Sequence, residues 1–184
     1  MHTPNDRRYS GDIERLRSPQ RMALMEVERV VELALTGVTA QSALDIGTGS
    51  GLFAEHFAAR GLTVAGVDLR EDMLEAARQY VPTGDFRQGR MEAVPFDDAA
   101  FDLVFLGHVL HEADDLVGAL REARRTARMR VVVLEWPHRA QDYGPPLDHR
   151  LTPEQVAAAA LEAGLPQFEQ IDLTHLVLYR LNLG

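Results

Sequence analysis

The sequence predicts an α/β protein whose parallel sheet is covered by helices on both faces. Short, almost wholly apolar strands alternate with segments of helical periodicity. Strands of this kind are typical of a parallel sheet that is buried on both sides, and right-handed crossovers then give a doubly wound sheet. Three glycines at alternate positions, Gly47, Gly49 and Gly51, stand between the first strand and the next helix. Glycines at this place let a ligand lie against backbone N–H groups.

The first helix is expected over residues 20–35. Ser18 supplies an N-cap oxygen, Pro19 suits the first turn, and Gly37 stands just past the end. Residues 1–40 precede the first strand and are expected to form a helical cap.

Five strands and their connecting helices follow the cap. The strands are expected at 43–46, 63–69, 85–89, 101–107 and 129–136, and the helices at 51–60, 71–81 and about 113–127. A 14-residue loop, 137–150, then leads to a helix at 154–164 that begins behind a Thr152–Pro153 cap. Residues 167–183 are expected to form two final strands.

Length and composition bound the possible functions. At 184 residues the chain is expected to be one ligand-binding domain, residues 1–184. The absence of cysteine excludes disulfides, thiolate metal sites and cysteine nucleophiles, and fits a cytoplasmic location. No run of 18 apolar residues predicts a membrane span, and the polar first residues do not resemble a signal peptide.

The charge of the chain disfavours a nucleic-acid partner. The net charge is −9, whereas proteins that bind nucleic acid usually present a basic face. The one local basic run, residues 121–128, is interpreted as the solvated face of a helix. Every basic residue is arginine, which removes lysine Schiff-base and P-loop chemistry.

Asp45 and the glycine spacing distinguish two ligand classes. A dinucleotide would place its anionic pyrophosphate on this loop, where a carboxylate two residues before Gly47 would repel it. S-adenosylmethionine carries an ammonium and a cationic sulfur, which a carboxylate would attract. The spacing is also G-x-G-x-G rather than the dinucleotide G-x-G-x-x-G. Both details favour S-adenosylmethionine.

Asp68 is the second expected anchor. It ends the second strand, 17 residues beyond Gly51, where a carboxylate can accept hydrogen bonds from both ribose hydroxyls of an adenosine. NAD sites use the same arrangement, so the pair Asp45 and Asp68 is more informative than Asp68 alone. The alternative is that each acid only caps the next helix.

The segments "LDIGTGSG", "VAGVDLREDMLEAAR" and "FRQGRMEAVPFDDAAFDLVFLGHVLHEADD" resemble the class I S-adenosylmethionine-dependent methyltransferases. The likeness is to the small type 11 group related to ubiquinone and menaquinone methyltransferases, and it covers about residues 43–137. It implies a Rossmann-like, mostly parallel sheet of about seven strands with the last strand antiparallel, built from residues 43–184. It also implies that S-adenosylmethionine is the cofactor and S-adenosylhomocysteine the product.

The resemblance assigns a set of cofactor-binding residues. Met91 would contact the adenine, and Arg90 stands where the family usually has an acid or an amide. Since arginine cannot accept a hydrogen bond, Arg90 is expected to contribute its backbone or to stack its guanidinium on the ring. The expected residues are Asp45, Gly47, Thr48, Gly49, Gly51, Asp68, Leu69, Met73, Arg90, Met91, Gly107 and His108.

The expected reaction is methyl transfer to an oxygen or carbon of a small molecule. The Asn/Asp-Pro-Pro-Tyr-like signature of enzymes that methylate nucleobase amino groups is absent after the fourth strand. His108, His111 and His149 are candidates for a general base that deprotonates a phenol or enol, and the alternative for each is a packed histidine. No closed set of ligands at metal-binding spacing is present, so no metal site is expected.

Methyl transfer also calls for a cover that excludes water, and residues 1–20 and 137–150 are the expected lid. Two other functions remain open. One is a domain that binds S-adenosylmethionine without catalysis. The other is an NAD-linked oxidoreductase, which Asp45, the glycine spacing and the lack of a second substrate domain disfavour. The sequence indicates neither the methyl acceptor nor the oligomeric state.

Overall fold

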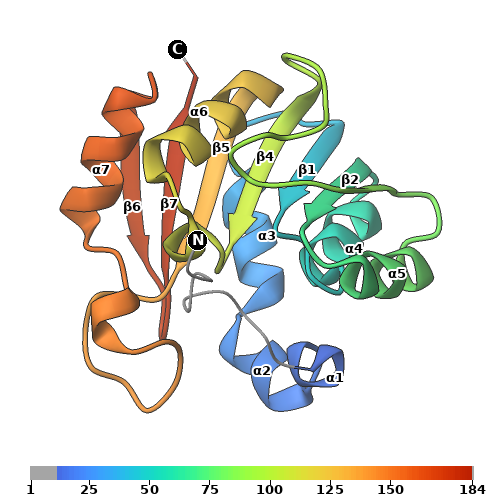
Figure 1. Ribbon diagram of the computed structural model, residues 1–184, viewed down its shortest axis with the longest axis horizontal. Coiled ribbons are helices and arrows are strands. Elements are labelled where there is room, and N and C mark those ends of the chain that lie inside the picture. The colour runs from blue at the N-terminus through green and yellow to red at the C-terminus, as the bar shows by residue number, and fades with distance from the viewer. Residues whose placement is uncertain (1–11, 184) are drawn as a thin grey trace, which may run out of the picture.

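The computed structural model describes residues 12–183, whose strands form one mixed sheet in the order β3-β2-β1-β4-β5-β7-β6 (Figure 1). Strands β1 to β5 pair in parallel with one another, whereas β7 is antiparallel to both β5 and β6. The predicted mostly parallel sheet of about seven strands with an antiparallel last strand is therefore confirmed. The strands are β1 (Ser42–Ile46), β2 (Thr63–Asp68), β3 (Asp85–Gln88), β4 (Phe101–Gly107), β5 (Ala127–Glu135), β6 (Gln167–Asp172) and β7 (Val177–Asn182).

Helices cover both faces of this sheet, as the apolar strands predicted (Figure 1). Along β4, Leu103 and Phe105 pack with the helices of residues 27–35, 52–59 and 71–80, whereas Val104 and Leu106 pack with those of residues 116–126 and 153–162. Successive side chains point to opposite faces, and here both faces are buried. The helices are α1 (Ile13–Leu16), α2 (Pro19–Leu24), α3 (Val27–Leu35), α4 (Leu52–Ala59), α5 (Glu71–Tyr80), α6 (Leu116–Thr126) and α7 (Pro153–Glu162).

The helix expected over residues 20–35 is interrupted. Ser18 caps α2 as predicted, accepting a hydrogen bond from the Arg21 N–H at 3.3 Å. The chain then turns at Glu26, whose φ of 46° lies in the left-handed region, before α3 starts. The Glu26 carboxylate accepts the Thr174 N–H at 2.9 Å, a contact with a distant segment that helical periodicity does not reveal. Residues 1–11 of the expected cap lie outside the described residues.

The segment after β4 also differs from the expected helix at about 113–127. A short 3-10 helix, η1 (Leu110–Glu112), comes first, and α6 starts behind Asp115, which accepts the Gly118 N–H at 2.9 Å. The fifth strand begins at Ala127, two residues earlier than expected at 129. The Thr152 cap of α7 is confirmed as a reciprocal box with Gln155.

Within residues 12–183, none of the helices combines the length and the apolar character needed to cross a bilayer.

Candidate functional site

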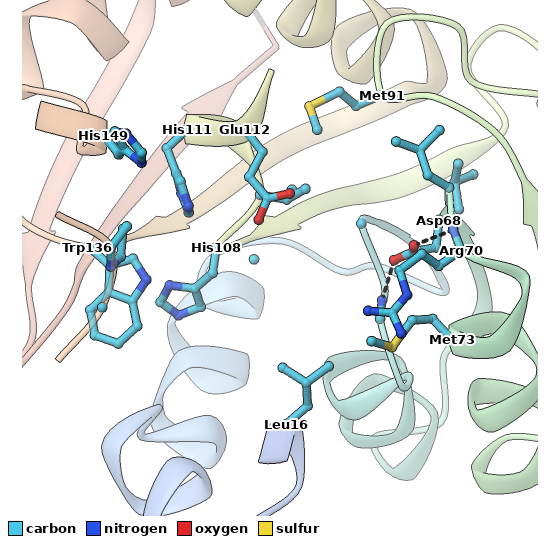
Figure 2. A pocket seen from close by; sticks show the side chains of 18 of the residues that line it. Leu16, Asp68, Arg70, Met73, Met91, His108, His111, Glu112, Trp136 and His149 are labelled. Carbon is cyan, nitrogen blue, oxygen red and sulfur yellow. Dashed lines mark hydrogen bonds between the residues drawn. The ribbon is translucent and has the colours of Figure 1, made fainter. Parts of the chain in front are cut away.

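A cavity of about 630 Å³ opens where β1, β2, β4 and β5 end (Figure 2). Because parallel strands present their carboxyl ends at one edge, the turns that follow them converge there. A smaller hollow of about 70 Å³ is lined by Asp45 and Thr48 and shares Gly47, Gly49, Gly107 and His108 with the larger cavity. The predicted residues that line the larger cavity are Gly47, Gly49, Asp68, Leu69, Met73, Met91, Gly107, His108, His111 and His149.

The glycines of the loop after β1 have different surroundings. All three have positive φ, between 51° and 75°. A Cβ on Gly47 would lie 2.5 Å from a methyl of Val109, and one on Gly51 would lie 2.9 Å from the Cβ of Ala77. A Cβ on Gly49 would meet only Leu16, at 3.4 Å. The open space of the loop is therefore at Gly49, whereas Gly51 allows α4 and α5 to pack and is not among the cavity-lining residues.

Asp68 joins the glycine loop to the turn after β2. Its Oδ2 accepts the Gly49 N–H at 2.8 Å and its Oδ1 accepts the Arg70 N–H at 2.9 Å (Figure 2). Burial raises the pKa of Asp68, although these N–H groups work in the opposite direction. The carboxylate thus faces the cavity with both oxygens held by backbone donors and retains lone pairs for further donors.

Asp45 lies deeper than Asp68. It is buried, and the Thr48 hydroxyl donates to its Oδ2 at 2.8 Å. Burial raises the pKa of Asp45 to about 7, against the hydrogen bond from Thr48. A cationic ligand group in the adjoining hollow would favour the ionised carboxylate.

Arg90 has its guanidinium in ion pairs. It lies 2.5 Å from Asp114 and 3.5 Å from Glu92. Of the two residues predicted to flank the adenine, Met91 lines the cavity and Arg90 is not among the described lining residues. Glu92, the next residue of the same loop, lines it as well.

His108 has buried ring nitrogens without hydrogen-bond partners in the described part of the chain and a left-handed backbone, both of which cost free energy. Both ring nitrogens are buried and have no hydrogen-bond partner among residues 12–183, and the backbone φ of 58° is left-handed. Burial lowers the pKa of His108 to about 3, so the ring is neutral. The ring lies 4.9 Å from that of Trp136, between centroids, and borders both cavities.

His111 forms a buried pair with Glu135, the last residue of β5. Its Nδ1 lies 2.9 Å from Oε2, its backbone N–H donates to Oε1 at 3.0 Å, and the Trp136 N–H donates to Oε2 at 3.1 Å. Burial opposes charge on both groups. The attraction between them nevertheless raises the pKa of His111 and lowers the pKa of Glu135. The sequence analysis missed Glu135, although an acid that ends an apolar strand is the same signal that marked Asp45 and Asp68.

Two distant segments complete the walls. Arg15, Leu16 and Arg21 come from α1 and α2, and Gly144, Pro145, Pro146 and His149 come from the loop at 137–150. Both segments were expected as a lid, and both border the cavity.

A buried or half-buried arginine anchors each of these segments. The Arg17 guanidinium donates to the Ser50 carbonyl at 2.9 Å, pairs with Glu55 at 2.7 Å and lies 3.3 Å from the centre of the Tyr80 ring. The Arg150 guanidinium donates to the carbonyls of Pro137, Arg139, Tyr143 and Pro145 at 2.7–3.2 Å. The walls at both ends of the cavity are therefore tied to the body of the protein.

The described residues contain no group of three or more His, Asp or Glu side chains placed to hold a metal ion.

Comparison with known proteins agrees with the resemblance noted in the sequence. The model of the methyltransferase domain family matches residues 44–133. A malonyl-[acyl-carrier protein] O-methyltransferase of Erwinia pyrifoliae is 38% identical over 101 residues, which are 55% of this chain and 38% of that protein. A demethylmenaquinone methyltransferase of Renibacterium salmoninarum is 33% identical over 119 residues, 64% of this chain and 49% of that protein. The chain thus spans less than half of the length of these curated relatives.

The fold is also found among solved structures. A SAM-dependent methyltransferase from Aquifex aeolicus superimposes with a TM-score of 0.82 at 21% identity, over 92% of this chain and 96% of that one. At this identity the likeness concerns the fold.

Proposed function

We propose that the protein is an S-adenosylmethionine-dependent methyltransferase, because the model of the methyltransferase domain family matches residues 44–133. It transfers the methyl group to an oxygen or carbon of a small molecule and releases S-adenosylhomocysteine. We further propose that residues 1–184 act as one domain. The observation that carries the proposal is that Asp68 and the open side of Gly49 face one cavity at the ends of the strands.

The residues present suit this cofactor. The lone pairs that Asp68 retains can accept the ribose hydroxyls, and Asp45 can face the ammonium from the smaller hollow. Met91 offers a soft apolar contact for the adenine. The cofactor supplies a methyl group already activated by its sulfonium, so the chain itself has to bind, align and exclude water. The other predicted residues that line either cavity keep that role in the proposal, whereas Gly51 and Arg90 are not among the described lining residues.

The two alternatives make different predictions. A domain that binds S-adenosylmethionine without catalysis would bind the cofactor and transfer no methyl group. An NAD-linked oxidoreductase would bind NAD in place of S-adenosylmethionine. The buried Asp45 next to the glycine loop disfavours this alternative, because its carboxylate would repel a pyrophosphate. One relative is named an O-methyltransferase, which supports oxygen as an acceptor atom here.

Calorimetric titration with S-adenosylmethionine, S-adenosylhomocysteine and NAD tests the proposal, together with a labelled-methyl assay on a metabolite extract. We expect Asp68→Ala to weaken S-adenosylmethionine binding at least about tenfold, because hydrogen bonds to charged groups contribute about 1.5–3 kcal/mol. Asp85→Ala is the matched control, since Asp85 is an exposed acid at the start of β3 whose carboxylate pairs with Arg87. Unchanged affinity in a folded Asp68→Ala protein, or binding of NAD alone, would contradict the proposal.

A further inference from the structure

The end of the cavity away from Asp68 has walls of a different kind. We call it the acceptor chamber. In Figure 2, His108, His111, Trp136 and His149 gather on one side of the cavity, and Asp68, Arg70 and Met73 lie on the other. Aromatic, imidazole and proline surfaces suit a flat, partly apolar molecule. The acceptor chamber is lined by His108, His111, Trp136, Pro145, Pro146 and His149.

His108 brings to the acceptor chamber two buried ring nitrogens that lack hydrogen-bond partners among the described residues. A neutral imidazole has one donor and one acceptor nitrogen, and neither finds a partner among the described residues. Buried polar groups in native proteins are nearly always paired, and left-handed backbone at a residue other than glycine clusters at functional sites. A ligand with a polar group beside its ring would pair with these nitrogens.

His111 gives the acceptor chamber a proton acceptor of fixed orientation. Its Nδ1 lies against Glu135, which leaves Nε2 as the nitrogen available to a ligand. The carboxylate of Glu135 is itself held by the N–H groups of His111 and Trp136. An acid, an oriented imidazole and a ligand pocket in this order form the arrangement of a general base.

We propose that the acceptor chamber binds a phenol or enol by its planar ring, and that His111, oriented by Glu135, takes the proton of the hydroxyl whose oxygen is methylated. This inference rests on the proposed methyltransferase function. In the step, the methyl–sulfur bond breaks, a methyl–oxygen bond forms, and the electron pair stays on the sulfur. The hydroxyl proton moves to Nε2 of His111 and then to solvent. His111 is the catalytic residue and Glu135 a positioning residue.

The charges around His111 agree with this role. Burial opposes a charge on the ring, whereas Glu135 of β5 and Glu112 of η1 raise the pKa of His111 and Arg150 of the loop lowers it. The net effect raises the pKa, which makes His111 a better proton acceptor. His108, whose pKa burial lowers to about 3, stays neutral and serves as a hydrogen-bonding partner.

The test compares two phenols of different acidity as probes, phenol and 4-nitrophenol, in a labelled-methyl assay at mildly alkaline pH. The second probe is already largely ionised in water and needs no base. We expect His111→Gln to lower kcat with phenol at least about a hundredfold and with 4-nitrophenol much less. The affinity for S-adenosylhomocysteine should stay within about twofold. The control is His138→Gln, which replaces an exposed histidine of the same loop as His149 that is not among the lining residues.

Glu135→Gln tests the positioning role. Removing the carboxylate lowers the pKa of His111, so the acid limb of the pH–rate profile with phenol should move to lower pH, with a smaller loss of kcat than in His111→Gln. A role in folding alone would leave that limb in place.

The unaltered protein offers a measurement that does not depend on a variant folding. With a base, the rate with phenol stays level as the pH rises above the pKa of His111, whereas without one it rises about tenfold per pH unit with the ionised fraction of phenol. A phenol rate that follows the ionised fraction of phenol with pH would overturn the inference. So would an equal loss with both probes in His111→Gln, or methylation of amines in place of both phenols. If neither probe is methylated by protein that binds S-adenosylhomocysteine, the acceptor class is wrong. If S-adenosylhomocysteine does not bind, the proposed function itself is wrong.

Discussion

At the scale of single residues, the buried Asp45 carboxyl has a raised pKa, which a cationic ligand would lower. Its pKa in the folded protein is raised by burial from 3.8 to about 7. Protonation is therefore easier in the folded than in the unfolded chain. The stability that Asp45 contributes is complete below pH 3.8 and is lost as the pH rises through about 7. An ammonium group bound in the adjoining hollow would reverse this preference.

We predict that S-adenosylmethionine binding at a pH slightly below 7 releases a proton from Asp45, because the cationic ligand lowers the raised pKa. Calorimetric titrations in two buffers of different ionisation enthalpy measure this release. In Asp45→Asn the release should disappear and the affinity should fall. Proton release of the same size in that variant would place the titrating group elsewhere.

The acids of the site show what single residues reveal before the fold is known. Asp45 and Asp68 were found because each lies at the carboxyl end of a strand, next to the glycine loop or at the expected ribose position, and this is a local pattern. Glu135 ends a strand too, but its meaning depends on His111, 24 residues earlier in the chain. That pairing exists only because β4 and β5 are neighbours in the sheet.

At the scale of elements, the glycine loop after β1 has to pack closely against a neighbouring side chain and also has to leave space for a ligand. Gly47 and Gly49 share a positive φ, but only Gly47 has a side chain, that of Val109, inside the space of a Cβ. Gly47 thus allows the loop to pack against Val109, the residue before η1, and Gly49 leaves space for a ligand in the cavity.

We predict that Gly47→Ala and Gly49→Ala separate these requirements. Both should lose about 1–2 kcal/mol of unfolding free energy from left-handed strain, and Gly47→Ala about 1–3 kcal/mol more from overpacking. Gly49→Ala should weaken S-adenosylhomocysteine binding because its Cβ enters the open side of the loop, and Gly49→Val should abolish it. Urea denaturation and calorimetric titration measure the two effects. Equal stability loss in both alanine variants would contradict this division.

The order of strands and helices could be predicted from the sequence, because apolar strands, helix caps and helix-ending glycines are local signals. The break between α2 and α3 at Glu26 could not be predicted, because the Glu26 carboxylate accepts a hydrogen bond from Thr174, which is 148 residues later in the chain. The loop at 137–150 was expected only as a lid. Its internal order depends on Arg150, whose four carbonyl partners come together only in the folded loop.

At the scale of the whole molecule, two segments that are far apart in the sequence line one cavity. The α1–α2 segment is tied to the glycine loop by Arg17, and the loop at 137–150 covers the side of Trp136. A Cβ on Gly144 would lie 2.7 Å from the Trp136 ring, so the loop backbone packs closely against the indole.

We predict that both segments, which single arginines tie to the body of the protein, exchange amide hydrogens faster than the strands of the sheet in the free protein, and that at least one becomes protected when S-adenosylhomocysteine binds. Hydrogen exchange with and without the product, compared over residues 12–24 and 137–150, measures this. Protection confined to residues 45–51, 68–73 and 89–92 would remove the lid role and leave the cofactor site as proposed.

The position of β7 has a consequence for the order in which the site is completed during synthesis. β7 follows β5 and β6 along the chain but lies between them in the sheet. Until residues 177–182 leave the ribosome, β5 is an edge strand and β6 lacks its partner in the sheet. Glu135 is paired with Val177, the first residue of β7. The strands that carry the glycine loop and Asp68 can therefore assemble first, and the strand that carries the partner of His111 gains its second neighbour last.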